Sequence, residues 1–278
     1  MSDCVAGGTP GSTPDVSVVL PAYQAAAVAQ RQVPVLQEFL ARIGVPHEVI
    51  LVDDGSDDDG ATAEVARRLG VTYLVQPTNQ GKGAAVRRGM RAARGRYRLY
   101  TDIDVPYDLA SLESVLWYLS FKEYDMVAGD RTLANSSYFH RVPVARQLAS
   151  KVYSTLVGRF LVGGWFDTQC GLKGFAGPVA DDLFSVARID RFAFDVELFY
   201  LALKRNYDIK RVPVRLRVNE TSSIHLARDG AAMVRDLGVM RLHQLLGHYQ
   251  PVVPVHHHGD TTPRPFRLPR DTAPEERR

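Results

Sequence analysis

The chain has 278 residues, of which 45% are hydrophobic and 23% are charged, the composition of an ordinary soluble globular protein. A formal net charge of +3 is too small to indicate nucleic acid as a partner, although it suits an anionic substrate or an acidic membrane surface. The two cysteines, Cys4 and Cys170, give no sign of a disulfide framework or a zinc site, so the expected compartment is a reducing cytoplasm.

The two ends of the chain differ in composition from the middle. Residues 1–14 are rich in Gly, Ser, Thr and Pro, residues 251–278 form a Pro/Arg/His tail, and both segments are predicted to be disordered. The N-terminus lacks the basic start and the apolar core of a signal peptide. The longest uncharged stretch, 16–30, is shorter than the ~20 apolar residues of a transmembrane helix. Residues 15–250 are expected to form one cytoplasmic domain, with peripheral contact at the inner face of the membrane as a further option.

The first part of the chain alternates between strands and helices. Continuous apolar runs predict buried strands at 15–23, 47–56, 71–76 and 97–104. Helical patterns lie between them: one runs through Phe39–Leu40, and others span 59–70 and 81–94. This alternation predicts an α/β fold with a parallel sheet and right-handed crossovers. Polar residues gather at the carboxyl ends of these strands, the edge at which open α/β sheets bind ligands.

From residue 111 the strict alternation ends. The patterns then predict a helix (111–121), a strand running into a loop (124–131), a basic and apolar helical region (138–162), a polar turn (167–177), a helix (192–206), a strand (209–218) and a last helix (226–247). One face of the last helix carries Leu226, Met233, Leu237 and Met240, opposite Arg228 and Arg235. This apolar stripe predicts either core packing or peripheral contact with a membrane.

Two aspartates come at the end of the fourth predicted strand. Asp102 and Asp104 are separated by one residue and point to the same side, so they can jointly hold a hard cation such as Mg²⁺ or Mn²⁺. Such a cation neutralises a diphosphate and makes it a better leaving group. For a lone D-x-D motif the commoner role is a solvated turn in which an aspartate caps a helix. The pair therefore decides nothing by itself.

The second predicted strand also ends in acids. Asp54 is placed to accept a hydrogen bond from a nucleobase, and a turn closed by an aspartate is an equal alternative for Asp53 and Asp54. The following N-Q-G-K-G motif lacks the leading glycine and the Ser/Thr of a Walker A loop. Its amides and Lys82 still suit an anionic group, with a tight turn and a solvent-exposed lysine as the alternative.

Two later motifs carry further polar groups. Asp195 and Glu197 lie near the start of the 192–206 helix, where a carboxylate is a candidate general base for an acceptor hydroxyl. The alternatives are a helix cap or a pair with Arg188 or Arg191. The 167–177 turn suits either a sugar-binding loop or a purely structural turn, and its polar residues are Asp167, Thr168, Gln169 and Lys173.

The order of these motifs is more specific than any one of them. The chain carries, in succession, V-S-V-V-L-P-A-Y, V-D-D-G-S, N-x-G-K-G, D-x-D, G-D-R, D-T-Q-C-G-x-K-x-F and F-D-V-E-L. This succession resembles family 2 glycosyltransferases of the GT-A fold, most closely their dolichyl-phosphate β-glucosyltransferase and polyprenyl-phosphate glycosyltransferase branch. The resemblance covers about residues 16–245. It implies a Rossmann-like α/β nucleotide-diphospho-sugar transferase fold with a mostly parallel central sheet flanked by helices.

The resemblance also implies roles for individual residues. The nucleotide-sugar donor would be bound by Pro21, Ala22, Tyr23, Asp53, Asp54, Lys82, Asp102, Ile103 and Gln169. The metal ion, Mg²⁺ or Mn²⁺, would be held by Asp102 and Asp104. The acceptor would be bound by Arg131, Arg141, Ser223 and His225, with residues 138–162 near the membrane. The expected catalytic set is Asp104, Arg131 and Asp195.

The implied reaction is a metal-dependent, inverting transfer of a hexose, with UDP-glucose as the first choice of donor and a polyprenyl phosphate as the acceptor. A phosphate acceptor needs no strong base, so the metal and arginines would provide most of the catalysis. A soluble hydroxyl acceptor would need a base, for which Asp195 is the candidate. A third interpretation is a non-catalytic nucleotide-sugar-binding protein. An oligomer is compatible with all three.

Three features depart from the family pattern. The chain has P-A-Y-Q-A-A-A where the family usually has P-A-Y-N-E, so Gln24 is neutral and no acid follows it. It has T-S-S-I-H-L in place of a late G-S-K, which leaves Ser222, Ser223 and His225. Bacterial relatives often end in transmembrane helices, whereas this chain ends in a Pro/Arg/His tail.

Overall fold

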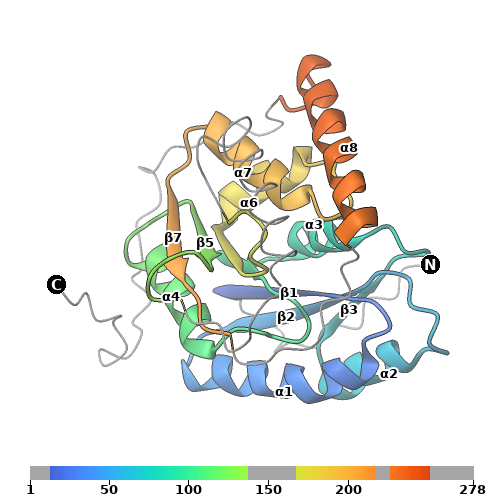
Figure 1. The fold of residues 1–278 in the computed structure, drawn as a ribbon. Coiled ribbons are helices and arrows are strands. Elements are labelled where there is room, and N and C mark those ends of the chain that lie inside the picture. Colours follow the sequence, from blue (N-terminus) through green and yellow to red (C-terminus); the bar gives the residue numbers. More distant parts are fainter. Residues whose placement is uncertain (1–12, 137–166, 217–225, 251–278) are drawn as a thin grey trace.

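A computed structural model describes residues 13–136, 167–216 and 226–250, and within 226–234 it describes the backbone alone (Figure 1). Its described strands form one seven-stranded sheet in the order β3-β2-β1-β4-β6-β5-β7. The strands are β1 (Val16–Ala22), β2 (His47–Asp53), β3 (Thr72–Val75), β4 (Tyr97–Tyr100), β5 (Met126–Asp130), β6 (Lys173–Ala176) and β7 (Ile209–Pro213). The predicted termini, 1–14 and 251–278, lie almost wholly outside the described residues.

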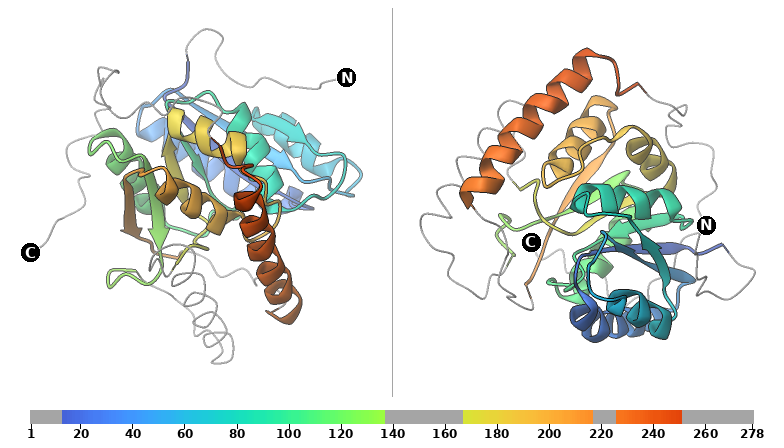
Figure 2. Two further views of the ribbon diagram at one scale, coloured as in Figure 1. Left: turned by 90° about the horizontal axis from the view of Figure 1, so that it is seen from above. Right: turned by 90° about the vertical axis from the view of Figure 1, so that its right-hand side faces the viewer.

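Helices cover both faces of this sheet (Figure 1, Figure 2). They are α1 (Ala26–Arg42), α2 (Ala61–Leu69), α3 (Lys82–Ala92), α4 (Leu109–Ser120), α6 (Gly177–Val186), α7 (Phe194–Lys204) and α8 (Leu226–Leu245). One apolar core lies between the sheet and α1, α2 and α4. The other lies between the sheet and α3, α6 and α7, with one end of α8 packed against it. The predicted α/β architecture is confirmed.

The central strand β1 shows why the sequence folds in this way. Val16, Val18 and Leu20 face the α1 side of the sheet, whereas Val19 faces the α3 side. Every residue of β1 is buried, because helices cover both faces of the sheet. A parallel strand in this position is therefore a continuous apolar run rather than an alternating one, which is the pattern of the sequence.

The sheet is mostly parallel, and β6 is its exception. This strand pairs antiparallel with β4 on one side and with β5 on the other. The prediction of a polar turn over all of 167–177 is therefore wrong at its end, because Lys173–Ala176 is a buried strand and α6 begins at Gly177. The fourth strand is also shorter than predicted, since β4 ends at Tyr100 and Asp102 and Asp104 lie in the following turn.

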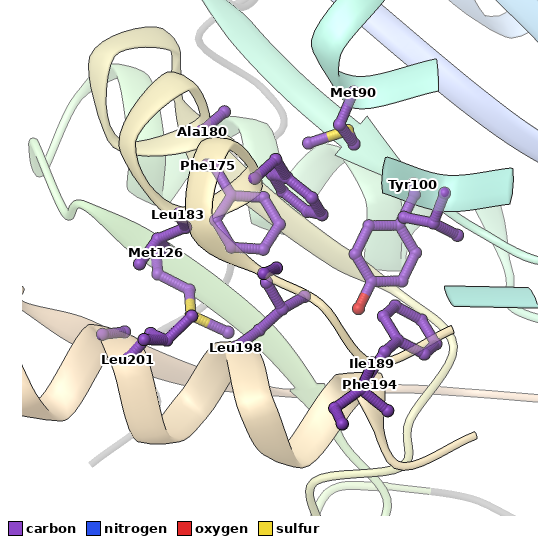
Figure 3. Packing of buried hydrophobic residues seen from close by; sticks show 14 of the residues in the cluster. Met90, Tyr100, Met126, Phe175, Ala180, Leu183, Ile189, Phe194, Leu198 and Leu201 are labelled. Carbon is purple, nitrogen blue, oxygen red and sulfur yellow. The ribbon is translucent and has the colours of Figure 1, made fainter. Parts of the chain in front are cut away.

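The α3 side of the sheet holds an aromatic core beside the site. Tyr100 of β4 stacks on Phe175 of β6, with ring centroids 6.1 Å apart, and lies 5.7 Å from the ring of Phe194. Figure 3 shows these rings packed together with Leu198 of α7. The hydroxyl of Tyr100 leaves this apolar cluster and bonds to Asp195. The core thus fixes β4 and α7 relative to each other at the carboxyl edge of the sheet.

The described side chains on the apolar face of the last helix pack against the core, which is one of the two predicted alternatives. Met240 is buried and Leu237 is partly buried against the α3-side core. The side chains of Leu226, Arg228 and Met233 lie outside the described part of the structure. Among the described residues, no helix combines the length and apolar character that crossing a bilayer requires.

Candidate active site

The carboxyl ends of β1, β2, β3 and β4 meet at one edge of the sheet. Ala22 at the end of β1 is in register with Asp53 at the end of β2, and Asp53 is in register with Val75 of β3. The backbone N–H of Asp54 donates to the carbonyl of Ala22. Tyr23 follows with nearly half of its surface exposed. The predicted donor-binding segments, 21–23 and 53–54, are therefore neighbours in space.

Asp54 is buried, and groups of the chain itself bind its carboxylate. Oδ1 accepts hydrogen bonds from the side-chain amide of Gln76 at 2.6 Å and from the backbone N–H of Gln80 at 2.8 Å. Oδ2 accepts from the backbone N–H of Gly81 at 2.8 Å. Asp54 thus fixes the start of α3, and its predicted contact with a nucleobase stays a prediction.

Asp53 closes the turn that the alternative interpretation describes. Its Oδ1 accepts from the N–H and the hydroxyl of Ser56, at 2.9 and 2.6 Å, and its Oδ2 accepts from the hydroxyl of Tyr73 at 2.7 Å. Burial, together with the Asp53 carboxylate, raises the pKa of Tyr73. Asp53 therefore shapes the loop after β2, and its direct contact with a donor stays a prediction.

The glycines at the start of α3 permit close packing. A Cβ on Gly81 would come within 2.6 Å of the Asp190 carbonyl, and one on Gly83 within 2.6 Å of Cβ of Phe194. The N–H groups of Gln80 and Gly81 bind Asp54, and that of Ala84 donates to the Asp190 carbonyl at 3.0 Å. These amides are engaged within the chain, which makes this loop a packed junction with the 189–194 segment.

Lys82 reaches from the start of α3 to the D-x-D turn. Its ammonium forms an ion pair with Oδ1 of Asp102, and 20% of its side chain is exposed. Burial opposes the charged form, but Asp102, Asp195 and Asp104 together raise the pKa of Lys82. The alternative of a solvent-exposed lysine is therefore wrong, because the ammonium is paired with Asp102 and most of the side chain is covered.

The D-x-D turn lies against the 167–172 loop. A Cβ on Gly171 would overlap Oδ2 of Asp102, so only a glycine allows this close approach. The helix-cap alternative does not apply to Asp102 or Asp104, because Asp108 caps α4 by accepting from the N–H of Ser111. Within the described ranges, no three His, Cys, Asp or Glu side chains form a metal-binding group. Ile103, between the two aspartates, packs against the α1-side core.

Asp195 belongs to a buried polar cluster. Its Oδ1 accepts from the Tyr100 hydroxyl at 2.5 Å and from the Lys173 ammonium at 2.6 Å, and the Asp195 and Lys173 side chains are 3% and 0% exposed. Burial, followed by the Asp195 charge, raises the pKa of Tyr100. Asp195 therefore pairs with Lys173 rather than with Arg188 or Arg191. Its role as a general base stays a prediction.

Glu197 has a structural role that the sequence left open. Its carboxylate accepts from the backbone N–H groups of Arg188 and Ile189 and, at 2.6 Å, from the Tyr249 hydroxyl. Burial raises the pKa of Glu197 although these hydrogen bonds oppose the rise. Glu197 thus orders the 188–190 segment, whose Asp190 carbonyl in turn binds the start of α3.

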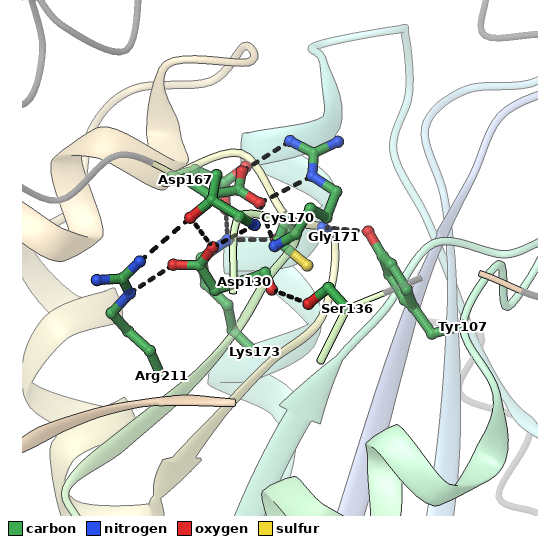
Figure 4. A network of polar contacts seen from close by, with 11 residues as sticks. Tyr107, Asp130, Ser136, Asp167, Cys170, Gly171, Lys173 and Arg211 are labelled. Carbon is green, nitrogen blue, oxygen red and sulfur yellow. Dashed lines mark hydrogen bonds and ion pairs between the residues drawn. The ribbon is translucent and has the colours of Figure 1, made fainter. Parts of the chain in front are cut away.

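Arg131, the predicted acceptor ligand, is held by Asp167. Its Nε and Nη2 donate to the two carboxylate oxygens at 2.9 and 2.7 Å, and its backbone N–H also donates to Asp167. Burial opposes both charges, yet their hydrogen bonds raise the pKa of Arg131 and lower that of Asp167. Beside this pair, Asp130 binds Arg211 (Figure 4). The sequence did not identify Asp167 as the partner of Arg131.

Two buried polar groups beside these residues find no partner among the residues that the structure describes. Nε2 of Gln169 and Oγ1 of Thr101 are buried and make no hydrogen bond within the described structure. Gln169 belongs to the loop that contains Gly171, and Thr101 precedes Asp102. A buried donor without a partner is costly, so Gln169 is suited to a ligand hydroxyl or carbonyl. The predicted acceptor ligands Arg141, Ser223 and His225 lie outside the described residues.

Comparison with known sequences identifies relatives over most of the chain. The sequence model of a family described as "Glycosyl transferase family 2" matches residues 17–184. A dolichyl-phosphate beta-glucosyltransferase of Drosophila melanogaster is 33% identical over 255 residues, which cover 84% of this chain and 76% of the relative. The protein of the same name from Homo sapiens is 31% identical over 262 residues, covering 84% and 77%.

Comparison with solved structures identifies the same fold. A glucosyl-3-phosphoglycerate synthase from Mycobacterium tuberculosis, in complex with Mn²⁺, UDP and phosphoglyceric acid, matches with a TM-score of 0.60 and 17% identity, covering 87% of this chain and 80% of that one. A mannosyl-3-phosphoglycerate synthase from Rubrobacter xylanophilus matches with a TM-score of 0.58 and 20% identity, covering 86% and 77%. The predicted GT-A fold is confirmed.

Proposed function

Because this chain belongs to glycosyl transferase family 2, we propose that it transfers glucose from UDP-glucose to a polyprenyl phosphate, with inversion at C1 of the sugar. The observation that carries the proposal is the environment of Asp102, which lies at the carboxyl edge of the sheet, paired with Lys82 and closely packed against Gly171. This is the edge at which α/β sheets bind ligands. The relatives named dolichyl-phosphate beta-glucosyltransferase support the choice of sugar and acceptor.

The D-x-D carboxylates fit a divalent cation. Asp102 already binds one cationic group, the Lys82 ammonium, and the charge of Asp104 also raises the pKa of Lys82. Two carboxylates with the remaining ligands drawn from phosphate and water are typical of Mg²⁺ sites. When bound, Mg²⁺ or Mn²⁺ would neutralise the charge that develops on the departing diphosphate. The Mn²⁺ and UDP in the Mycobacterium structure support this assignment.

The donor would lie along the ends of β1 and β2. The backbone of Pro21 and Ala22, the exposed ring of Tyr23 and the loop fixed by Asp54 provide a surface for the nucleotide. Gln169, with its unpartnered amide, is the proposed ligand for the donor sugar. Lys82 would contribute positive charge beside the diphosphate, which is the common use of a lysine at a phosphate site.

The acceptor phosphate would bind Arg131. Within the described residues, Asp167 engages Nε and one N–H of Nη2, so we assign the acceptor phosphate to Nη1, and 34% of the side chain is exposed. An oxygen of the acceptor phosphate attacks C1 from the face opposite the diphosphate. The bond between C1 and the diphosphate oxygen breaks, UDP leaves with the bonding electrons, and the product is a glucosyl phosphate lipid.

The burial and the hydrogen bonds of Asp195 favour a phosphate acceptor over a hydroxyl acceptor. A hydroxyl must lose its proton to a base within hydrogen-bonding reach, whereas a phosphate is already ionised near neutral pH. Oδ1 of Asp195 is bound to Tyr100 and Lys173, and the side chain is almost fully buried. Asp195 would therefore act as a fixed negative charge beside Lys82 and Lys173.

Organic-phase transfer tests the proposal directly. The protein is incubated with labelled UDP-glucose, Mg²⁺ and a short polyprenyl phosphate, and the label extracted with the lipid is counted. We expect transfer by the wild type and by Glu64→Gln, a control that changes an exposed carboxylate on α2, and no transfer by Asp104→Ala. Metal-dependent binding of UDP without any lipid labelling would contradict the proposed choice of acceptor or of sugar. Failure of the wild type to bind UDP would overturn the proposal as a whole.

A further inference from the structure

Lys173 is a fully buried charged side chain next to the proposed donor site. It belongs to β6, which lies between β4 and β5 in the sheet, and its exposed fraction is 0%. The rings of Tyr100 and Phe199 lie 5.4 and 5.7 Å from its ammonium. A buried ammonium is costly unless it is paired and fully hydrogen-bonded. The groups that accept hydrogen bonds from this ammonium are therefore important for the structure.

The ammonium of Lys173 donates hydrogen bonds to two different parts of the site. It donates to Oδ1 of Asp195 in α7 at 2.6 Å. It also donates to the carbonyl oxygen of Cys170 at 2.6 Å. Lys173 thus joins the first turn of α7 to the loop that precedes β6.

The carbonyl of Cys170 and the N–H of Gly171 belong to the same peptide unit. The carbonyl accepts from Lys173, and the N–H donates to the hydroxyl of the buried Tyr107 at 3.1 Å. Figure 4 shows Tyr107, Gly171 and Cys170 side by side. Both polar groups of this peptide are therefore fixed, one by β6 and the other by the segment after the D-x-D turn.

This fixed peptide lies against Asp102. Gly171 is so close to Oδ2 of Asp102 that a Cβ there would overlap the carboxylate. A rotation or shift of the Cys170–Gly171 peptide would therefore displace Asp102. Gly171 has no side chain, so its backbone lies directly against the carboxylate on the side of Oδ2, while Lys82 pairs with Oδ1.

We infer that Lys173 is a positioning residue for the D-x-D motif: by holding the Cys170–Gly171 peptide, it fixes the Asp102 carboxylate for a divalent cation and a nucleoside diphosphate. The inference rests on the proposed function, because it assumes that Asp102 serves a metal-bound diphosphate. Lys173 itself does not contact the donor, since it is fully buried within the sheet. Within the 167–177 motif, Lys173 thus has a positioning role, whereas Gln169 remains the proposed ligand for the donor sugar.

Calorimetric binding of UDP, with and without Mn²⁺, tests this role without any transfer reaction. For Lys173→Met we expect Mn²⁺-dependent UDP binding to weaken at least about 10-fold, the scale seen when partners of metal ligands are removed. Binding of UDP without metal should change little, because residues 21–23 and 53–54 make neither of the hydrogen bonds that hold this peptide. The control is Lys204→Met, which removes an exposed lysine from α7.

Tyr107→Phe provides a second, milder variant. It keeps the buried ring and removes only the hydroxyl that accepts from Gly171, so we expect the same selective loss of Mn²⁺-dependent binding, to a smaller extent. If Lys173→Met does not fold, unchanged binding by Tyr107→Phe overturns the inference. If the wild type binds UDP with Mn²⁺ and both variants match it, this inference alone fails. If the wild type does not bind UDP at all, the proposed function fails with it.

Discussion

Lys82, the first residue of α3, forms an ion pair with Asp102 in the turn after β4. The pair joins the start of α3 to the turn after β4 at the carboxyl edge of the sheet. It also places a positive charge on the carboxylate proposed to hold a divalent cation. In the free protein, a lysine and a metal ion would therefore compete for the same oxygen atoms.

This competition gives a first prediction. Lys82→Met should bind Mn²⁺ alone about fivefold more tightly, because a partly exposed ion pair of ~1 kcal/mol no longer has to be broken. Transfer should nevertheless fall, since the charge beside the diphosphate is lost. Titration of Mn²⁺ by electron paramagnetic resonance measures the affinity, with Lys204→Met as the surface control. Weaker Mn²⁺ binding by Lys82→Met would contradict the competition.

Gly171→Ala tests the close approach at Asp102 from the other side. The new methyl group would overlap Oδ2 of Asp102, so the carboxylate has to move. We expect lipid-phosphate glucosylation to fall at least about 100-fold, the loss that a misplacement of roughly 1 Å can cause. Gly238→Ala in α8 is a matched control, because nothing lies within 4 Å of its added Cβ. It should retain activity and gain up to about 1 kcal/mol of stability from the helix propensity of alanine. An active Gly171→Ala would show that Asp102 can move without consequence.

Arg131→Lys separates charge from geometry at the proposed acceptor site. A lysine keeps the positive charge but cannot bind both oxygens of Asp167 in the forked manner of the guanidinium. We expect KM for polyprenyl phosphate to rise about 10-fold and KM for UDP-glucose to stay within a factor of about two, since one good charged contact is worth ~1.4 kcal/mol. Steady-state kinetics with each substrate varied in turn measure both values.

The control for Arg131→Lys is Arg67→Lys on α2. Arg67 binds Glu64 through the same two nitrogens, but on an exposed helix surface. Both kinetic parameters of this variant should equal those of the wild type. An effect of Arg131→Lys on the donor KM alone would assign Arg131 to the donor side of the site.

The sequence predicts the sheet edge well because parallel strands have a simple pattern. Strands buried on both faces are continuous apolar runs, and β1 and β2 are of this kind. The polar residues after each run, including Asp54 and Asp102, could therefore be assigned to one edge before any coordinates. The groups that bind Asp54 could not be predicted from the sequence, because they are 22 to 27 residues away and belong to another loop.

The strand β6 shows where such reasoning fails. It has four residues, K-G-F-A, with a lysine at its start and a glycine next to it, a composition typical of a turn. Because fully buried lysines are rare, a lysine in the sequence predicts an exposed side chain. Its partner Asp195 is 22 residues further along the chain. Only the fold reveals that the two charges compensate each other inside the sheet.

Glu197 should make stability depend on pH. Its native pKa is raised above 4.5, mainly by burial, so its contribution to stability is fully present below the ordinary glutamate pKa and is lost as pH rises through the native value. Glu197→Gln lacks this titration and presents an amide to two backbone N–H donors, so it should be less stable by about 1–3 kcal/mol. Urea unfolding at several pH values from about 4 to 7 should show the gap between wild type and variant narrowing as pH rises. A gap that widens over this range would contradict the raised pKa.

The buried pair of Lys173 and Asp195 predicts strongly non-additive stabilities. Asp195→Asn leaves a buried ammonium without its counter-ion and should cost about 3–5 kcal/mol, whereas Asp195→Asn combined with Lys173→Met removes both charges and should recover much of this loss. The asparagine keeps an acceptor for the Tyr100 hydroxyl, so the cycle isolates the charge pair. Urea unfolding of the wild type, both single variants and the double variant gives the coupling energy. Additive losses would mean that the ammonium is stabilised by Cys170 and the aromatic rings, and Asp195 would then be available to act as a base.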